Sequence, residues 1–230
     1  MKTPSRPLRI GGILFPGLDQ ADFTGPFEVL SRVPEAEFFV IGADRSPVRD
    51  ARGLVLTPQL GFAESPDLDV LLVPGGPGVN ALMENEVALD FLRRQTGSVR
   101  LVLSVCTGAL VLGAAGLLRG RRATTHWASH HLLSLLGAIP VDDRVVVDGS
   151  LITTAGVTSG LDGALRAAAL LRGDQAAQEI QLYMEYAPAP PFDAGSPQTA
   201  PAAVRAAVQA SLRDMTRERE EITRRVAARL

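Results

Sequence analysis

The sequence predicts an α/β protein with a mostly parallel sheet flanked by helices. Short apolar runs recur between segments with helical spacing, which is the pattern of repeated strand–helix–strand units. In addition, 46% of the 230 residues are hydrophobic and the net charge is only −2, so the chain has the material for a sizeable core. We expect one domain over residues 1–230.

Five short apolar runs are the candidate strands of the parallel sheet. Between them lie segments with helical patterns, which we predict to be the crossover helices that parallel strands require. The candidate strands are residues 8–15, 37–41, 54–57, 70–73 and 101–105, and the candidate crossover helices are residues 25–32 and 79–94.

The second half of the chain begins with a predicted hairpin. Two β-rich runs flank Asp148-Gly149-Ser150, and an Asp-Gly pair in this position indicates a tight turn. Two helices are expected next, and the second ends where consecutive prolines prevent its continuation. These elements are the strands 144–147 and 151–154, the helices 158–171 and 174–186, and the proline-rich loop 188–201.

The C-terminal segment 202–230 is predicted to be one amphipathic helix. Its apolar residues fall on one helical face, and the opposite face carries charges of alternating sign. We expect this helix to pack on the domain and to have no catalytic role. The apolar residues are Val204, Val208, Leu212, Met215, Ile222 and Val226.

Cys106 is the single cysteine, and it separates the apolar run 101–105 from a small-residue helical run at 107–113. This order predicts a strand, a sharp turn and a helix, with a nucleophile at the turn. A thiol at the start of a helix faces unpaired N–H groups and the positive end of the helix dipole, both of which favour the thiolate. The alternative is a structural cysteine, because cysteine is often buried in protein interiors.

Three candidate site segments follow predicted strands. Asp22 comes after the first strand, Gly75 and Gly76 after the fourth, and Cys106 after the fifth. Because open α/β sheets place their sites at the carboxyl ends of strands, we expect a carboxylate, backbone N–H groups and a thiol around one cavity, as nucleophilic catalysis requires. The alternatives are that Asp22 caps a helix beginning near Gly25 and that the glycines only form a tight turn.

Several classes of function are disfavoured. His126 and His130 have the spacing of a metal-binding pair, but no third ligand follows at suitable spacing, so we predict hydrogen-bonded or surface histidines and no metal site. The low net charge offers no basic surface for nucleic acid. We expect a soluble, cytoplasmic protein for three reasons. The chain has a single cysteine, residues 1–12 do not have the pattern of a secretory leader, and no apolar run has the character of a membrane span.

The chain resembles the ThiJ/PfpI superfamily over nearly its whole length. Within that superfamily it is most similar to the isocyanide hydratases, through Thr107 directly after the cysteine and through residues 156–162 and 185–192. The motifs shared with the superfamily are Asp22-x-Thr24-Gly25-Pro26, Pro74-Gly75-Gly76, Ser104-Val105-Cys106-Thr107-Gly108 and Arg122-Ala123-Thr124-Thr125-His126-Trp127.

This resemblance implies a flavodoxin-like sandwich that forms a homodimer and adds water to a small-molecule isocyanide without a cofactor. It implies that Cys106 attacks the isocyanide carbon to form a thioimidate, that Asp22 activates water, and that Thr107 assists. The N–H groups of Gly75 and Gly76 would polarise the reacting group. Because adjacent carboxylate and thiolate groups disfavour double ionisation, Asp22 and Cys106 are expected to share one proton.

Two other classes of protein remain open. One is a different thiol enzyme of the superfamily, such as a glyoxalase-like enzyme, although those use a glutamate where this chain has Asp22. Protease and glutaminase chemistry are disfavoured, because Thr107 replaces the histidine that follows the nucleophile in PfpI proteases and no histidine follows His131. The other is a ligand-binding or redox-sensing module, since peroxide also oxidises reactive cysteines. Residues 202–230 are too short for the two helix-turn-helix motifs of AraC-type regulators.

Overall fold

The computed structural model describes residues 6–230 and has the predicted α/β architecture. Residues 1–5 lie outside this range. They are part of the segment 1–12, in which the sequence predicts no secretory leader. One seven-stranded sheet has the order β10-β11-β7-β6-β1-β2-β5, and all its neighbours are parallel except the hairpin pair β10–β11. The strands are β1 (Leu8–Ile13), β2 (Ala36–Gly42), β5 (Leu60–Gly61), β6 (Val70–Val73), β7 (Leu101–Ser104), β10 (Val145–Asp148) and β11 (Leu151–Thr154).

The central strands are buried on both faces. Every residue of β6, β7 and β11 is buried, so the alternation of polar and apolar residues that marks a half-exposed strand is missing. This burial explains why the sequence shows them as continuous apolar or small-residue runs. The predicted hairpin is also confirmed, with Val145 paired to Thr154 and Asp148 to Leu151.

The predicted strand at 54–57 does not belong to the large sheet. Its core forms β4 (Val55–Leu56), which pairs antiparallel with β3 (Val48–Arg49), and Val55 is 45% exposed. The reason is a local turn, in which the Asp50 carboxylate accepts hydrogen bonds from the N–H groups of Arg52 and Leu54. The edge of the large sheet is instead the two-residue β5, which was not predicted.

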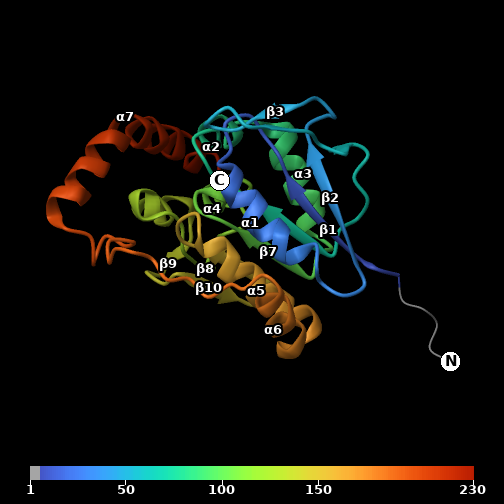
Figure 1. Ribbon diagram of the computed structural model, residues 1–230. Coiled ribbons are helices and arrows are strands. Elements are labelled where there is room, and N and C mark those ends of the chain that lie inside the picture. The colour runs from blue at the N-terminus through green and yellow to red at the C-terminus, as the bar shows by residue number, and fades with distance from the viewer. Residues whose placement is uncertain (1–5) are drawn as a thin grey trace.

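Two groups of helices cover the two faces of the sheet. On one face α1 and α5 lie side by side, with α6 against α5, and α2, α3 and α4 pack together on the other (Figure 1). Their bounds are α1 (Gln20–Leu30), α2 (Val79–Leu82), α3 (Glu86–Thr96), α4 (Gly108–Ala114), α5 (Ser159–Arg172) and α6 (Asp174–Tyr183). No helix within residues 6–230 has both the length and the apolar character needed to cross a membrane.

Two helix boundaries differ from the prediction because of capping side chains. Asp19 is the N-cap of α1, and its carboxylate accepts the N–H of Ala21 at 3.1 Å. The helix therefore starts before Asp22, which lies in the first turn and is not the cap. The segment 79–94 is two helices. The first ends at Leu82 with Met83 as its C-cap, and Asn85 begins the second, α3, by accepting the N–H of Ala88 at 3.1 Å.

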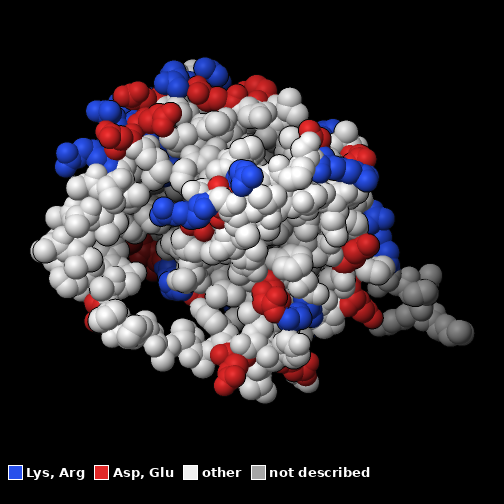
Figure 2. Space-filling view, turned by 45° about the horizontal axis from the view of Figure 1, so that its top comes forward, with Lys and Arg blue, Asp and Glu red and all other residues white. Residues whose placement is uncertain are grey.

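The C-terminal helix α7 (Ala202–Ala227) packs most tightly on the body along its second half, where its buried residues lie. Figure 1 shows it, in red, leaving the end of the proline-rich segment and returning across the molecule. The second half contacts α2, α4 and the 3₁₀ helices η1 (Trp127–Leu132) and η2 (Ser134–Leu136). In the first half, Val204 is 47% exposed. On the face drawn in Figure 2, positive and negative side chains are intermixed.

Candidate active site

Cys106 lies at the sharp turn between β7 and α4. Its φ is +54°, a left-handed conformation that few residues other than glycine adopt, and its side chain is buried. The Cys106 carbonyl accepts a 2.6 Å hydrogen bond from the hydroxyl of Thr125, which holds the turn in place. The strand, turn and helix expected around this cysteine are therefore present.

Asp22 is fully buried in the first turn of α1, beside the cysteine turn. Its Oδ2 accepts the N–H of Gly75 at 2.9 Å. Among the described residues, Oδ1 has no well-aligned hydrogen bond, although the Cys106 thiol is near enough to interact with the carboxyl group.

This environment makes Asp22 an unusual acid. Burial raises its pKa to about 7, the charge of Asp19 acts in the same direction, and the Gly75 N–H and the Cys106 thiol act against it. A carboxyl group with such a pKa both holds and releases a proton near neutral pH, as a general acid and base must.

The ionisation of Cys106 is linked to that of Asp22. Burial raises the pKa of the Cys106 thiol above its ordinary value and the charge of Asp22 raises it further, whereas the Thr107 N–H and Arg219 lower it. The helix start that was expected to favour the thiolate is thus outweighed by burial. When Asp22 carries a proton one of the opposing charges disappears, so the two groups titrate as a coupled pair.

The glycine turn after β6 is built around Asp22 and Thr107. The Gly75 N–H donates to Asp22, and the Gly76 N–H donates to Thr107 Oγ1 at 3.0 Å. A Cβ on Gly75 would lie 2.5 Å from the Thr107 nitrogen and 2.9 Å from Asp22 Oδ2, so no other residue fits there without displacement. Both N–H groups are therefore engaged by side chains, which differs from the expectation that they point to a reacting group.

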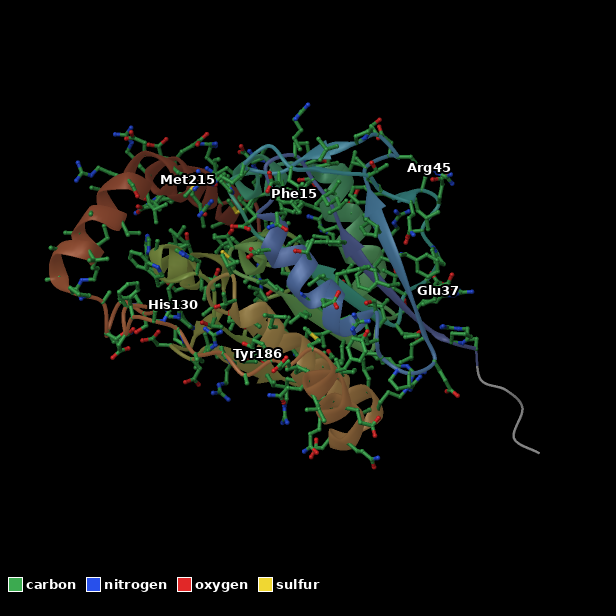
Figure 3. All side chains as sticks on the ribbon, viewed as in Figure 1. Phe15, Glu37, Arg45, His130, Tyr186 and Met215 are labelled. Carbon is green, nitrogen blue, oxygen red and sulfur yellow. The ribbon has the colours of Figure 1, made fainter. Side chains whose placement is uncertain are left out.

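A cavity of about 440 Å³ opens onto Cys106 and Thr107. One wall comes from Gly76 and Pro77, and Val157 forms part of another. The wall that sequence reasoning missed is α7, to which no catalytic role was assigned. This helix contributes Val208, Ser211, Leu212, Met215 and Arg219 to the lining, and Figure 3 labels Met215 on it.

The sequence contains a signal for this missed wall. Arg219 continues the three- and four-residue spacing of Leu212, Met215, Ile222 and Val226, so a charged residue stands in the middle of the apolar face of α7. A charge at a position that packing would give to an apolar residue is evidence of a special environment.

The histidines separate into two environments. His126 lines the cavity, and its Nδ1 accepts the N–H of Ala128 at 3.3 Å, which assigns the ring proton to Nε2. Burial, together with Arg219, lowers the pKa of His126, so the ring is neutral at pH 7. His130 lies within 3.0 Å of the Val141 carbonyl through Nε2, as expected for an internally hydrogen-bonded histidine (Figure 3). Within residues 6–230 no three His, Cys, Asp or Glu side chains are grouped to hold a metal.

The model of the DJ-1/PfpI family matches residues 9–169 of the chain. The protein belongs to the DJ-1/PfpI family. This confirms the superfamily expected from the motifs around Asp22, Gly75 and Cys106.

Individual DJ-1/PfpI relatives cover more of the chain. The isonitrile hydratase of Pseudomonas putida is 54% identical over 223 residues, which are 97% of this chain and 98% of that protein. The crystal structure of a THiJ/PfpI family protein from Pseudomonas syringae is 38% identical, with a TM-score of 0.92 over 94% of this chain and 90% of that chain. The glutathione-independent glyoxalase DJR-1.2 of Caenorhabditis elegans is 29% identical over 58% of this chain and 73% of that protein.

The match to the DJ-1/PfpI family model ends before α6, the proline-rich segment and α7. The candidate site therefore combines residues from the matched region, such as Asp22 and Cys106, with a wall from a helix that follows it.

Proposed function

We propose that this protein is an isocyanide hydratase, which adds water to the terminal carbon of an isocyanide and produces an N-substituted formamide. The observation that carries the proposal is the buried pair of Cys106 and Asp22, a nucleophile beside a carboxyl group whose pKa is near 7. The identity of 54% to an isonitrile hydratase over nearly the whole chain supports the choice of substrate.

In the first step, the Cys106 sulfur forms a bond to the terminal carbon of the isocyanide, R–N≡C. The proton lost from the thiol reaches that carbon through the Asp22 carboxyl group, giving the thioimidate Cys106–S–CH=N–R. This covalent step divides a difficult hydration into two easier reactions.

In the second step, the Asp22 carboxylate takes a proton from water while the water oxygen attacks the thioimidate carbon. Asp22 passes the proton it took from water to the nitrogen of the resulting tetrahedral intermediate. The C–S bond then breaks as the hydroxyl group becomes the carbonyl and its proton passes to the departing sulfur. The products are the formamide R–NH–CHO and the Cys106 thiol. Neither step is a redox reaction, and we propose that no cofactor takes part.

We propose positioning roles for Gly75 and Gly76 and an assisting role for Thr107. The glycine N–H groups hold Asp22 and the Thr107 hydroxyl next to the nucleophile. The apolar cavity wall formed by Val157, Leu212 and Met215 suits an alkyl or aryl substituent on the isocyanide. We also propose that the protein acts as a homodimer, as the family resemblance implies, and that it is located in the cytoplasm, which its lone cysteine favours.

The test is formamide production from a small aliphatic isocyanide by the purified protein and by Cys106→Ala and Asp22→Asn. We expect turnover to be abolished by the first substitution and strongly reduced by the second, with both variants folded by circular dichroism. No turnover of several isocyanides by a folded protein whose Cys106 still reacts with alkylating agents would refute the proposal.

The second candidate is rearrangement of an α-oxoaldehyde, as in a glyoxalase. The observation that favours it is His126 in the cavity with Cys106, because glyoxalase-like members combine a thiol, a carboxyl group and an imidazole. Incubation with methylglyoxal separates the two candidates. Lactate formation faster than isocyanide hydration, and lost in His126→Gln, would favour the second.

A further inference from the structure

Arg219 is a buried arginine at the centre of the surface between α7 and the rest of the molecule. It is 2% exposed and lines the same cavity as Cys106. Its Nε donates to Asn80 Oδ1 at 2.8 Å, its Nη1 to Ser129 Oγ at 3.1 Å, and its Nη2 to the Gly76 carbonyl at 3.3 Å. The guanidinium thus joins α7 to α2, to η1 and to the glycine turn.

All three acceptors of Arg219 are neutral. In the part of the chain that the structure describes, no carboxylate is in ion-pair contact with the guanidinium, and the neighbouring Glu218 instead accepts a hydrogen bond from Asn80 Nδ2 at 3.1 Å. A buried charge without a counter-ion is costly, and a neutral side chain of similar length would avoid that cost. The charge therefore calls for a negative group to balance it.

Two groups that line the cavity can carry a negative charge, the Asp19 carboxyl group and the ionised thiol of Cys106, and of these two it is Cys106 whose charge acts on Arg219. Burial lowers the pKa of Arg219 while the charge of Cys106 raises it, and Arg219 in turn counteracts the burial and the Asp22 charge that raise the pKa of Cys106. An arginine stays protonated under these conditions. Five other ionisable groups face this region. They are Asp22 and Asp19 at the start of α1, His126 before η1, Arg52 at the cavity wall and Glu218 on α7.

We infer that Arg219 is a positioning residue for the nucleophile, whose charge is the counter-ion of the Cys106 thiolate and whose hydrogen bond holds the Gly76 carbonyl. The hydrogen bond to the Gly76 carbonyl matters because the same glycine turn binds two site residues: the Gly76 N–H donates to Thr107 and the Gly75 N–H donates to Asp22. One guanidinium thus acts on the charge of the thiolate and on the glycine turn that binds Asp22 and Thr107.

The inference rests on Cys106 being the nucleophile of the proposed reaction, so its test measures the thiol directly and uses no isocyanide. The rate of alkylation by iodoacetamide is measured against pH for the parent protein, Arg219→Gln, Arg219→Lys and Ser129→Ala. Arg219→Gln removes the charge and keeps a hydrogen-bonding side chain. Arg219→Lys keeps the charge without the guanidinium fork, and Ser129→Ala removes one of the hydrogen bonds of Arg219 without changing any charge.

For Arg219→Gln we expect the midpoint of alkylation to rise by about one pH unit, with alkylation at neutral pH about tenfold slower. Ser129→Ala leaves the midpoint unchanged, and Arg219→Lys shifts it less than Arg219→Gln does. An unchanged midpoint in Arg219→Gln, or equal shifts in the Gln and Lys variants, would overturn the inference, because loss of hydrogen bonds alone would then explain the result.

If Arg219→Gln does not fold, the exchange Asn80→Asp with Glu218→Gln tests the same inference. It conserves net charge but moves a carboxylate next to Arg219 Nε, so the guanidinium gains a competing counter-ion. We expect the alkylation midpoint to rise here too, and an unchanged midpoint in the folded variant would overturn the inference. Shifted midpoints in a protein that hydrates no isocyanide would support the role of Arg219 and refute only the proposed reaction.

Discussion

The matched DJ-1/PfpI region and the helix α7 contribute to the candidate site in different ways. Asp22, Gly75 and Cys106 follow β1, β6 and β7, so the parallel sheet itself brings them to one edge. The residues of α7 come from a segment after the match and contribute a further part of the cavity lining. The comparison teaches that the fold assembles the reacting groups, whereas a peripheral helix sets the shape and part of the charge around them.

The largest effect is expected for Gly75→Ala, which tests the sheet-derived part of the site, that is, the groups that the parallel sheet brings together. The added Cβ meets the Thr107 nitrogen and Asp22 Oδ2, so one of these groups must move. We expect formamide production to fall by about 100-fold, since sub-ångström misplacement of reacting groups is costly, and stability to fall by about 1–3 kcal/mol. Gly195→Ala is the matched control, because no atom lies near its added Cβ. Equal activities of the two variants would contradict the proposed packing.

The second prediction concerns stability and pH. The pKa of Asp22 is raised from 3.8 to about 7 in the folded protein, so the folded state holds a proton that the unfolded state releases. The stabilising contribution of Asp22 to the free energy of unfolding is therefore fully present below pH 3.8, its ordinary pKa, and is lost as the pH rises through the folded-state pKa of about 7. We expect Asp22→Asn to lack this loss and to be more stable than the parent protein at about pH 8, by about 1–3 kcal/mol.

Urea unfolding of both proteins at about pH 5 and at about pH 8 measures this effect. Cys106→Ala serves as the control, because it separates the charge of Asp22 from its coupling to the thiol. An Asp22→Asn protein that is less stable than the parent at the higher pH would show that the buried carboxylate is a net stabilising group.

A smaller effect is expected for the wall formed by α7. Met215→Ala enlarges the cavity beside Cys106 without touching the sheet-derived groups. We expect KM for an isocyanide with a bulky substituent to rise about 5- to 20-fold with little change in kcat, since the lost contacts are the same in the ground and transition states. Val204→Ala, at an exposed position of the same helix, should leave both constants unchanged. A fall in kcat alone would assign Met215 a different role.

The smallest effect is expected at Asn85, which caps α3 in the matched region but does not line the cavity. Asn85→Ala removes the bond to the Ala88 N–H and should cost about 1 kcal/mol of stability. Turnover at a temperature well below unfolding should not change. A loss of activity greater than the loss of folded protein would show that α3 influences the site.

The sequence predicts the sheet-derived part of the site well. The continuous apolar runs at β6 and β7 mark buried strands, and in a parallel sheet the residues that follow them converge. The alternative that Asp22 is only a helix cap is excluded by Asp19, which occupies that position. The pairing of residues 54–57 was not predictable from β propensity alone, because a turn at Asp50 offers a local partner.

The part contributed by α7 was harder to predict for a physical reason. Helical periodicity identifies the buried face of Leu212, Met215 and Ile222 but does not say which surface that face covers. Only the tertiary structure brings α7 over Cys106. The charge of Arg219 within the apolar face is the one local sign that this surface differs from ordinary core packing.

The most direct test of the proposed function is intact-mass spectrometry of Asp22→Asn after mixing with an isocyanide. If Cys106 attacks the isocyanide and Asp22 is needed to activate water, while solvent can replace Asp22 in the proton transfer of the first step, the variant should accumulate one adduct with the mass of the substrate, located on Cys106 by peptide mapping. The parent protein should release formamide with little adduct, and Cys106→Ala should show none. Formamide production by Cys106→Ala, or an adduct that forms at a residue other than Cys106, would contradict the account.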